Sequence, residues 1–244
     1  MIHTTHSLTR EEVCSIAVPE RDNVSSRWQG VPHRDLLTSI FDSAEQKGLK
    51  PLSERYETQH EGNDLFGVID FETPRNIVMP EGTQLSLGFR HSNLSHYAIT
   101  FAVGGRVLVC SNGMILGEFI VKRKHTTGAD VPELVDAGLN RFLDEAKNIN
   151  DFTEALKNTR CRDQMACRYI IEAGRQEVLP WAQLDNVQRL WFEPEHEEFD
   201  ARNRWSLYNA FTEVVRDRKH AAMQMKELRS VGEFILDPLG QSAN

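Results

Sequence analysis

The sequence lacks the features of three common classes of protein. Its 244 residues contain four cysteines but no C-x-x-C pair, so we expect neither a zinc knuckle nor a disulfide framework. No apolar run approaches the roughly 18 residues that a membrane helix needs. The N-terminal residues also lack the basic-then-apolar layout of a signal peptide. We therefore expect a cytoplasmic protein with no membrane partner.

Recognisable metal-binding motifs are absent as well. The nine histidines form no H-E-x-x-H sequence and no evident His/Asp cluster, and His196 lies in an acidic run. From this pattern we expect no structural metal and no cofactor.

Charge is unevenly distributed along the chain. The net charge of -8 argues against general affinity for nucleic acid, which depends on clustered Lys and Arg. Between Leu85 and Gly128, however, five basic residues accompany one acid, which gives a local charge of about +4. Such segregation predicts a basic surface on an acidic protein. Its candidate residues are Arg90, Lys122, Arg123 and Lys124. The alternative is that the last three form only a solvated strand end.

Hydrophobic periodicity predicts an α+β fold. Residues 33–47 show helical spacing and are closed by Gly48, whereas residues 55–58 and 65–72 read as strands. The pair Gly104-Gly105 predicts a two-residue hairpin, and hence an antiparallel meander, because glycine readily takes a positive φ. Further helices are expected at about residues 130–146, 150–156, 162–173 and 203–218.

These elements divide the chain into three parts. Residues 1–30 are polar and irregular and are expected to form an N-terminal arm. Residues 31–218 are expected to form a single α+β domain: an antiparallel meander sheet covered by helices on one face, with a C-terminal helical segment. Residues 219–244 are expected to form a C-terminal tail.

Small polar residues recur at the predicted strand ends and suggest one shared site. Amides, hydroxyls and imidazoles can bind a small ligand, and a His beside Cys or Ser can activate a nucleophile. No third orienting group is visible, so we assign no catalytic residue. The same residues are also explained as scaffold, because buried polar groups must be hydrogen-bonded. The pocket candidates are His91, Ser92, Asn93, Cys110, Asn112 and His125.

Four short segments carry a resemblance to a known family. They are residues 90–93 (RHSN), 109–113 (VCSNG), 123–126 (RKHT) and 204–213 (RWSLYNAFTE). In this order they resemble the phage and plasmid family catalogued as domain of unknown function 932, over about residues 55–218. Where members commonly carry an acid in the first turn, this chain has Ser92-Asn93-Leu94-Ser95. The resemblance implies a mobile genetic element and names no reaction.

The predicted order of a meander followed by a helix is similar to the core of single-strand annealing proteins of the Rad fifty-two kind. This similarity implies a DNA-binding protein that acts in recombination, with single-stranded DNA as its partner and a homo-oligomer such as a ring as its assembly. The basic residues named above would contact phosphates, and bases would stack on exposed aromatic or arginine planes. The alternative is a ligand-binding or enzymatic pocket protein of a mobile element, including one that acts in counter-defence.

Overall fold

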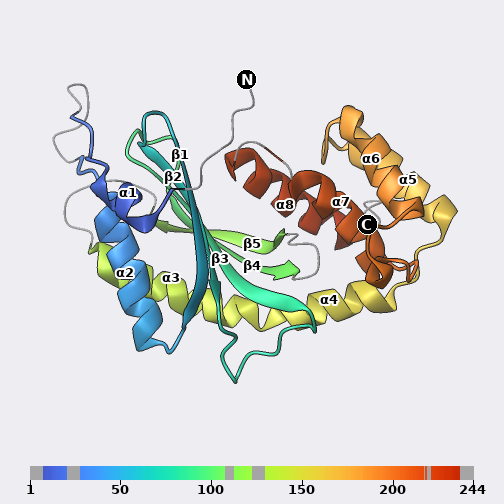
Figure 1. The fold of residues 1–244 in the computed structure, drawn as a ribbon, viewed down its shortest axis with the longest axis horizontal. Helices are drawn as coiled ribbons and strands as arrows, with labels where there is room; N and C mark the ends of the chain where they lie inside the picture. The colour runs from blue at the N-terminus through green and yellow to red at the C-terminus, as the bar shows by residue number, and fades with distance from the viewer. Residues whose placement is uncertain are drawn as a thin grey trace, which may run out of the picture. The chain divides into compact units, whose positions relative to one another are not determined.

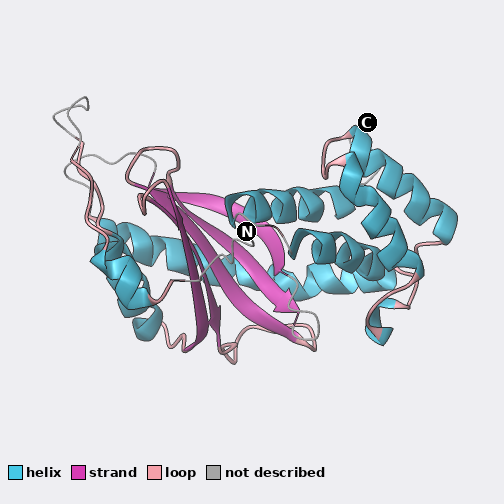
Figure 2. Ribbon diagram, turned by 45° about the horizontal axis from the view of Figure 1, so that its top comes forward, coloured by secondary structure: helices cyan, strands magenta, loops and turns pink. Residues whose placement is uncertain are grey.

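The computed structural model describes residues 8–20, 28–107, 113–122, 130–216, 218 and 221–236. Within these ranges the chain forms one five-stranded sheet in the order β1-β2-β3-β4-β5 and eight α-helices (Figures 1 and 2). The α+β fold and the antiparallel meander expected from the sequence are confirmed. None of the described helices combines the length and apolar character that crossing a membrane requires.

The strands are β1 (Pro51–Gln59), β2 (Asp64–Phe71), β3 (Thr83–Ser92), β4 (Ile99–Val107) and β5 (Gly113–Lys122). The helices are α1 (Arg10–Ser15), α2 (His33–Gln46), α3 (Val131–Ala146), α4 (Asn148–Asn158), α5 (Asp163–Arg175), α6 (Trp181–Phe192), α7 (Arg204–Arg216) and α8 (Ala221–Leu236). A short 3₁₀-helix, Glu197–Phe199, lies in the acidic run.

The chain packs as two compact units, where the sequence suggested one domain. The first unit contains α1 to α3 and most of the sheet, and the second contains α4 to α8 and the remaining strand ends. The first consists of residues 1–77, 85–103 and 117–146, and the second of residues 78–84, 104–116 and 147–244.

One face of the sheet carries the apolar core of the first unit. Leu85, Leu87 and Phe89 alternate along β3 and are fully buried. Their neighbours on β2 include Ile69 and Phe71, which are also fully buried. Because strand residues two apart share a face, this alternation defines one continuous apolar surface.

Helices of the first unit cover this apolar face. Each helix contacts it through a residue pair, namely Arg10 of α1 with Glu54, His33 of α2 with His91, and Phe142 of α3 with Phe71. The expectation of helices on one face is therefore confirmed for this unit.

The opposite face of β2 and β3, which we call the polar face, carries several buried polar residues beside apolar ones such as Phe66. Asp64 and Asp70 of β2 are both buried, and each pairs across the strands with a serine of β3. The Asp70 carboxylate accepts hydrogen bonds from the Ser53 hydroxyl at 2.5 Å and from the Ser86 hydroxyl at 2.6 Å. This carboxylate thus links β1 to β3 across β2.

The Gly104-Gly105 pair does not form the predicted hairpin turn. Both glycines lie inside β4, which continues to Val107. A Cβ on Gly104 would stand 1.9 Å from the carbonyl oxygen of Met114 in β5. The prediction was wrong because glycine also permits close backbone approach within a sheet, and a sequence does not distinguish this use from a turn.

Both ends of the chain contain more structure than expected. In the predicted arm, Thr9 and Glu12 form a capping box that starts α1. In the predicted tail, α8 buries Leu228, Val231 and Ile235, which are spaced as one helix face. The segment at 181–192, which we had not assigned to a helix, forms α6.

Replacing Gly104 with alanine is expected to destabilise the protein by about 1–3 kcal/mol, because the added methyl collides with backbone that cannot move aside. The matched control is Gly105→Ala, whose Cβ would meet the mobile end of the Met114 side chain at 2.9 Å. Urea unfolding of both variants measures the difference. Equal midpoints for the two variants would contradict the close approach.

Candidate metal centre

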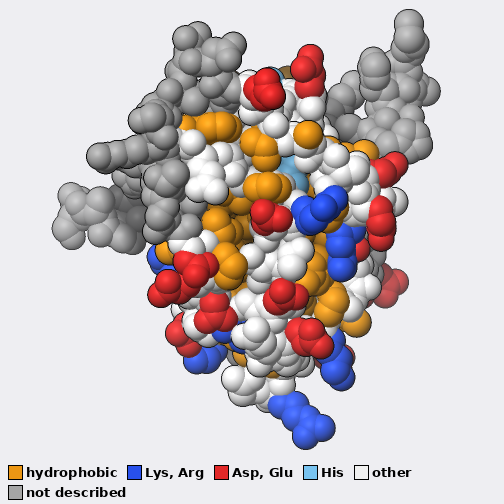
Figure 3. All heavy atoms as spheres, turned by 90° about the vertical axis from the view of Figure 1, so that its left-hand side faces the viewer, with side chains coloured by type: hydrophobic (Ala, Val, Ile, Leu, Met, Phe, Trp, Pro, Cys, Tyr) orange, Lys and Arg blue, Asp and Glu red, His pale blue; other side chains and the backbone are white. Residues whose placement is uncertain are grey.

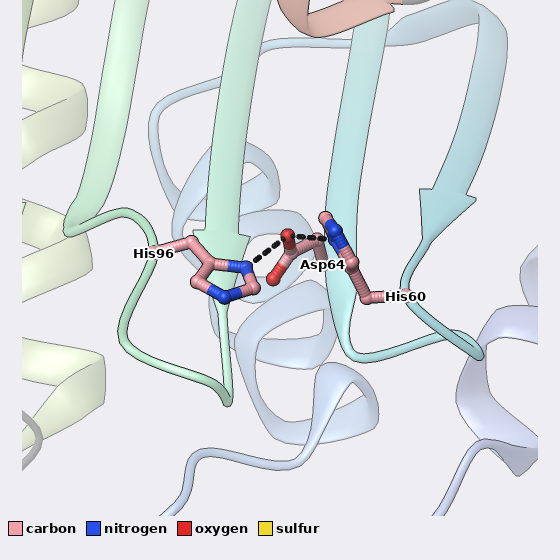
Figure 4. Close-up of side chains that lie close together, drawn as sticks. All are labelled: His60, Asp64 and His96. Carbon is pink, nitrogen blue, oxygen red and sulfur yellow. Dashed lines mark hydrogen bonds and ion pairs between the residues drawn. The ribbon is translucent and has the colours of Figure 1, made fainter.

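Two histidines and one aspartate meet at one end of the polar sheet face. His60 lies in the turn between β1 and β2, Asp64 begins β2, and His96 lies between β3 and β4. Nδ1 of His60 is 2.7 Å and Nδ1 of His96 is 2.8 Å from the same oxygen, Oδ2 of Asp64 (Figure 4). The candidate ligand atoms of the three residues lie within 4.8 Å of one another.

Strand pairing fixes the position of the Asp64 carboxylate. Asp64 is fully buried and lies opposite Ser92 of β3. The Ser92 hydroxyl accepts the backbone N–H groups of Leu94 and His96, both at 3.0 Å, which also shapes the loop that carries His96. Burial favours a higher pKa for Asp64, but hydrogen bonding by Ser92, His96 and His60 outweighs it and lowers this pKa. The carboxylate is therefore ionised at neutral pH.

An unusual turn holds His60. His60, Glu61 and Gly62 all have positive φ, at 51°, 57° and 87°. Such a conformation costs about 1 kcal/mol or more for a residue other than glycine, so surrounding contacts must maintain it. Asn63 donates two hydrogen bonds to the His60 carbonyl, and Nε2 of His33 donates to the Gly62 carbonyl at 2.7 Å. The backbone that carries His60 is thus fixed from two sides.

The cluster opens to solvent on the side of its imidazoles. The His60 and His96 side chains are 52% and 42% exposed, whereas Asp64 is buried beneath them. Their rings are 4.6 Å apart in an edge-to-face arrangement. Two imidazole nitrogens and one carboxylate form a ligand set that transition metals take in proteins, and the exposed side leaves room for further ligands.

Three of the predicted pocket residues are fully enclosed. His91, Ser92 and Asn93 are at most 2% exposed. Asn93 accepts the Val31 N–H at 2.9 Å and donates to the Val31 carbonyl at 3.1 Å, and His91 bonds the same carbonyl at 3.0 Å. His91 and Asn93 therefore fasten the segment before α2. Ser92 points to the other face of the sheet, where it lies opposite Asp64 and shapes the loop that carries His96. Cys110, Asn112 and His125 lie outside the described residues.

The predicted basic surface is described only at Arg90. This residue lies on the polar face, is partly buried, and holds its guanidinium 5.1 Å from the centre of the Tyr97 ring. The side chain of Lys122 and all of Arg123 and Lys124 lie outside the described residues. On the face shown in Figure 3, the described acidic and basic side chains are interspersed with apolar ones. Phosphate binding by these residues stays a prediction.

The metal-ligand cluster itself was missed. We expected no His/Asp cluster, and that expectation was wrong. The spacing of His60 and Asp64, four residues apart across a turn, was the available signal. The third member, His96, is 32 residues from Asp64 and joins it only through the β3–β4 loop. Sequence spacing alone does not display that contact.

The family motif near the C-terminus is part of the core. Trp205 stacks on Tyr208 at 5.6 Å between ring centres, and Asn209 donates to the Trp205 carbonyl at 2.9 Å. Thr212 and Glu213 are buried as well. The YNAFTE motif thus contributes to packing of the second unit.

These features define an α+β protein with a candidate His/Asp/His metal centre on a five-stranded sheet. Comparison with known proteins identifies its family. The model described as Domain of unknown function (DUF932) matches residues 21–232, so the chain belongs to this family. No curated protein and no solved structure matches the chain. The family resemblance expected from the sequence is confirmed, and the family description names no activity.

Replacing Asn93 with alanine is expected to lower the free energy of unfolding by about 1–3 kcal/mol, because it leaves the buried Val31 N–H without its acceptor, whereas the Val31 carbonyl keeps its bond from His91. Asn186→Ala, on the exposed surface of α6, is the control and should change stability by less than about 0.5 kcal/mol. Chemical denaturation measures both. Unchanged stability in the Asn93 variant would restore the residue as a candidate ligand contact.

Proposed function

We propose that the protein binds one divalent transition-metal ion through Nδ1 of His60, Nδ1 of His96 and the carboxylate of Asp64. The convergence of these groups carries the proposal: a buried, ionised carboxylate lies below two half-exposed imidazoles that both direct Nδ1 at it.

The chemistry of the ligands favours ions such as Zn²⁺, Co²⁺ or Fe²⁺ over Mg²⁺ and Ca²⁺. Imidazole nitrogen suits the former, whereas the latter prefer oxygen ligands. Three protein ligands also leave at least one coordination position open, as in catalytic metal sites. With metal–ligand distances of about 2.0–2.2 Å, tetrahedral ligand atoms lie roughly 3.4 Å apart. The two Nδ1–Oδ2 distances, now 2.7 and 2.8 Å, must therefore lengthen by roughly 0.6–0.7 Å, which the exposure of the imidazoles permits.

Wild-type protein is expected to bind Co²⁺ with the visible spectrum of a site containing nitrogen and oxygen ligands, and Zn²⁺ should displace the Co²⁺. His60→Ala, His96→Ala and Asp64→Asn should each weaken binding by at least about 100-fold, because each removes a direct ligand. Titration followed by absorbance and calorimetry measures these affinities.

The control for this titration is His196→Ala, which removes an imidazole from the acidic run of the second unit and should leave affinity unchanged. Circular dichroism shows whether each variant is folded. Wild-type affinity in folded variants at all three ligand positions would refute the site.

Metal binding is also expected to change the histidine tautomers. In the metal-free protein, Nδ1 of His60 and of His96 must carry the proton that the Asp64 carboxylate accepts. Coordination through Nδ1 requires the proton on Nε2. Long-range ¹H–¹⁵N correlation spectra with and without Zn²⁺ follow this change. His33 is the internal control, since its Nε2–H donates to the Gly62 carbonyl and should remain there.

A second proposal, single-strand annealing by a homo-oligomer of phage or plasmid origin, is supported by the local charge of about +4 between Leu85 and Gly128 and by the meander order of the strands. Binding of single-stranded DNA should weaken steeply between about 50 and 200 mM salt and fall in a Lys122/Arg123/Lys124 alanine variant. Fluorescence anisotropy measures it. Absence of binding at low salt would refute the proposal.

A further inference from the structure

The outer side of α5 and α6 exposes two large apolar residues beside each other. The two helices contact one another in the second unit (Figures 1 and 2). Trp181, the first residue of α6, is 58% exposed, and Ile171 of α5 is 55% exposed. Trp181 packs against Gly174, which lies one helical turn after Ile171. The indole and the isoleucine therefore form one apolar patch.

Gly174 lets the indole lie directly on α5. A Cβ at this position would stand 2.7 Å from two ring atoms of Trp181, so only glycine leaves space for the ring there. One side of the indole is thus supported by helix backbone, while more than half of the residue remains exposed. An exposed ring that is already held in place can stack on a planar ligand at small entropic cost.

Two arginines flank the patch. Arg168 and Arg175 lie three residues before and four residues after Ile171, so both adjoin it on the helix surface. Arg168 is exposed and has no ion-pair partner among the described residues. Arg175 is 70% exposed and only 3.8 Å from Glu172, a weak surface contact.

The charge around α5 is opposite in sign to that of the whole protein. Residues 160–192, which span both helices, contain five arginines against the acids Asp163, Glu172, Glu177 and Asp185, a local charge of about +1, whereas the chain carries a net charge of -8. An anionic partner is therefore favoured at this surface over the rest of the protein. Because the Trp181 indole offers a stacking surface, the partner should also carry planar groups between its anionic groups.

We infer that Arg168, Ile171, Arg175 and Trp181 form a binding surface for single-stranded nucleic acid. A base stacks on the exposed face of Trp181 beside Ile171, and phosphates on either side contact the two guanidinium groups. Single strands present both groups, because their bases are unpaired and their backbone is charged. This surface lies in the second unit and does not depend on the metal proposal or on the Lys122–Lys124 segment.

The test measures binding of fluorescein-labelled oligo-dT to the full chain by anisotropy at several salt concentrations. Trp181→Ala should weaken binding by about 5- to 150-fold without changing the salt dependence, since it removes only stacking. Trp181→Phe should restore most of the affinity. The Arg168→Ala/Arg175→Ala variant should lower the slope of log affinity against log salt by about 1.4, corresponding to two phosphate contacts.

Two controls separate the contributions of charge and base. Arg34→Ala/Arg141→Ala removes two exposed arginines of the first unit and should leave the slope unchanged. An abasic oligonucleotide, which keeps its phosphates but has no bases to stack, should bind wild type only as tightly as oligo-dT binds Trp181→Ala.

Three results would overturn the inference. The first is no binding of oligo-dT by wild type at 50 mM salt. The second is binding that Lys122/Arg123/Lys124 alanine substitution abolishes while Trp181→Ala leaves it unchanged. The third is sedimentation showing that Trp181→Ala dissociates an oligomer while affinity for oligo-dT is unaffected, which would assign the patch to contact with a second copy of the chain.

Discussion

A buried carboxylate, Asp64, is the constraint that links the sheet to the candidate metal centre. Removing a carboxylate from water costs several kcal/mol unless hydrogen-bond donors replace the lost hydration. Here the neighbouring groups are the Ser92 hydroxyl and the imidazoles of His60 and His96. A slip of one residue in the pairing of β2 and β3 would turn Asp64 toward the apolar face and separate it from them. Assembly of the candidate metal centre therefore requires the correct register between β2 and β3.

Most of the fold followed from local patterns in the sequence. Helical spacing placed α2, α3 and α5 to within a few residues, because their buried side chains recur with the helix period. The exceptions have specific causes. Gly104 serves close packing against β5 and not a turn. In α8 the apolar residues have helical spacing, but such a helix is stable mainly when its apolar face packs against other elements. The sequence does not show whether those elements are nearby.

The site was less accessible to sequence analysis because its members depend on tertiary contacts. Strand alternation predicts that Arg90 and His91 point to opposite faces, and they do. Alternation does not say which face another segment will cover. Val31 and its neighbours cover His91 and Asn93, so these two expected pocket residues are enclosed. His60 and His96 lie far apart in the sequence and are brought together only by the folding of their two loops around Asp64.

The unequal chain separations within the centre have a consequence for how it assembles. His60 and Asp64 belong to one hairpin and are four residues apart, whereas His96 arrives from 32 residues downstream. Local hairpins close before distant strands pair, because a longer loop costs more entropy to close. During folding, His60 and Asp64 would therefore come together before His96 reaches them. A metal ion bound at that stage would have one protein ligand fewer and would exchange readily. Tight metal binding would therefore require β3 to have paired with β2, because this pairing brings His96 to the site.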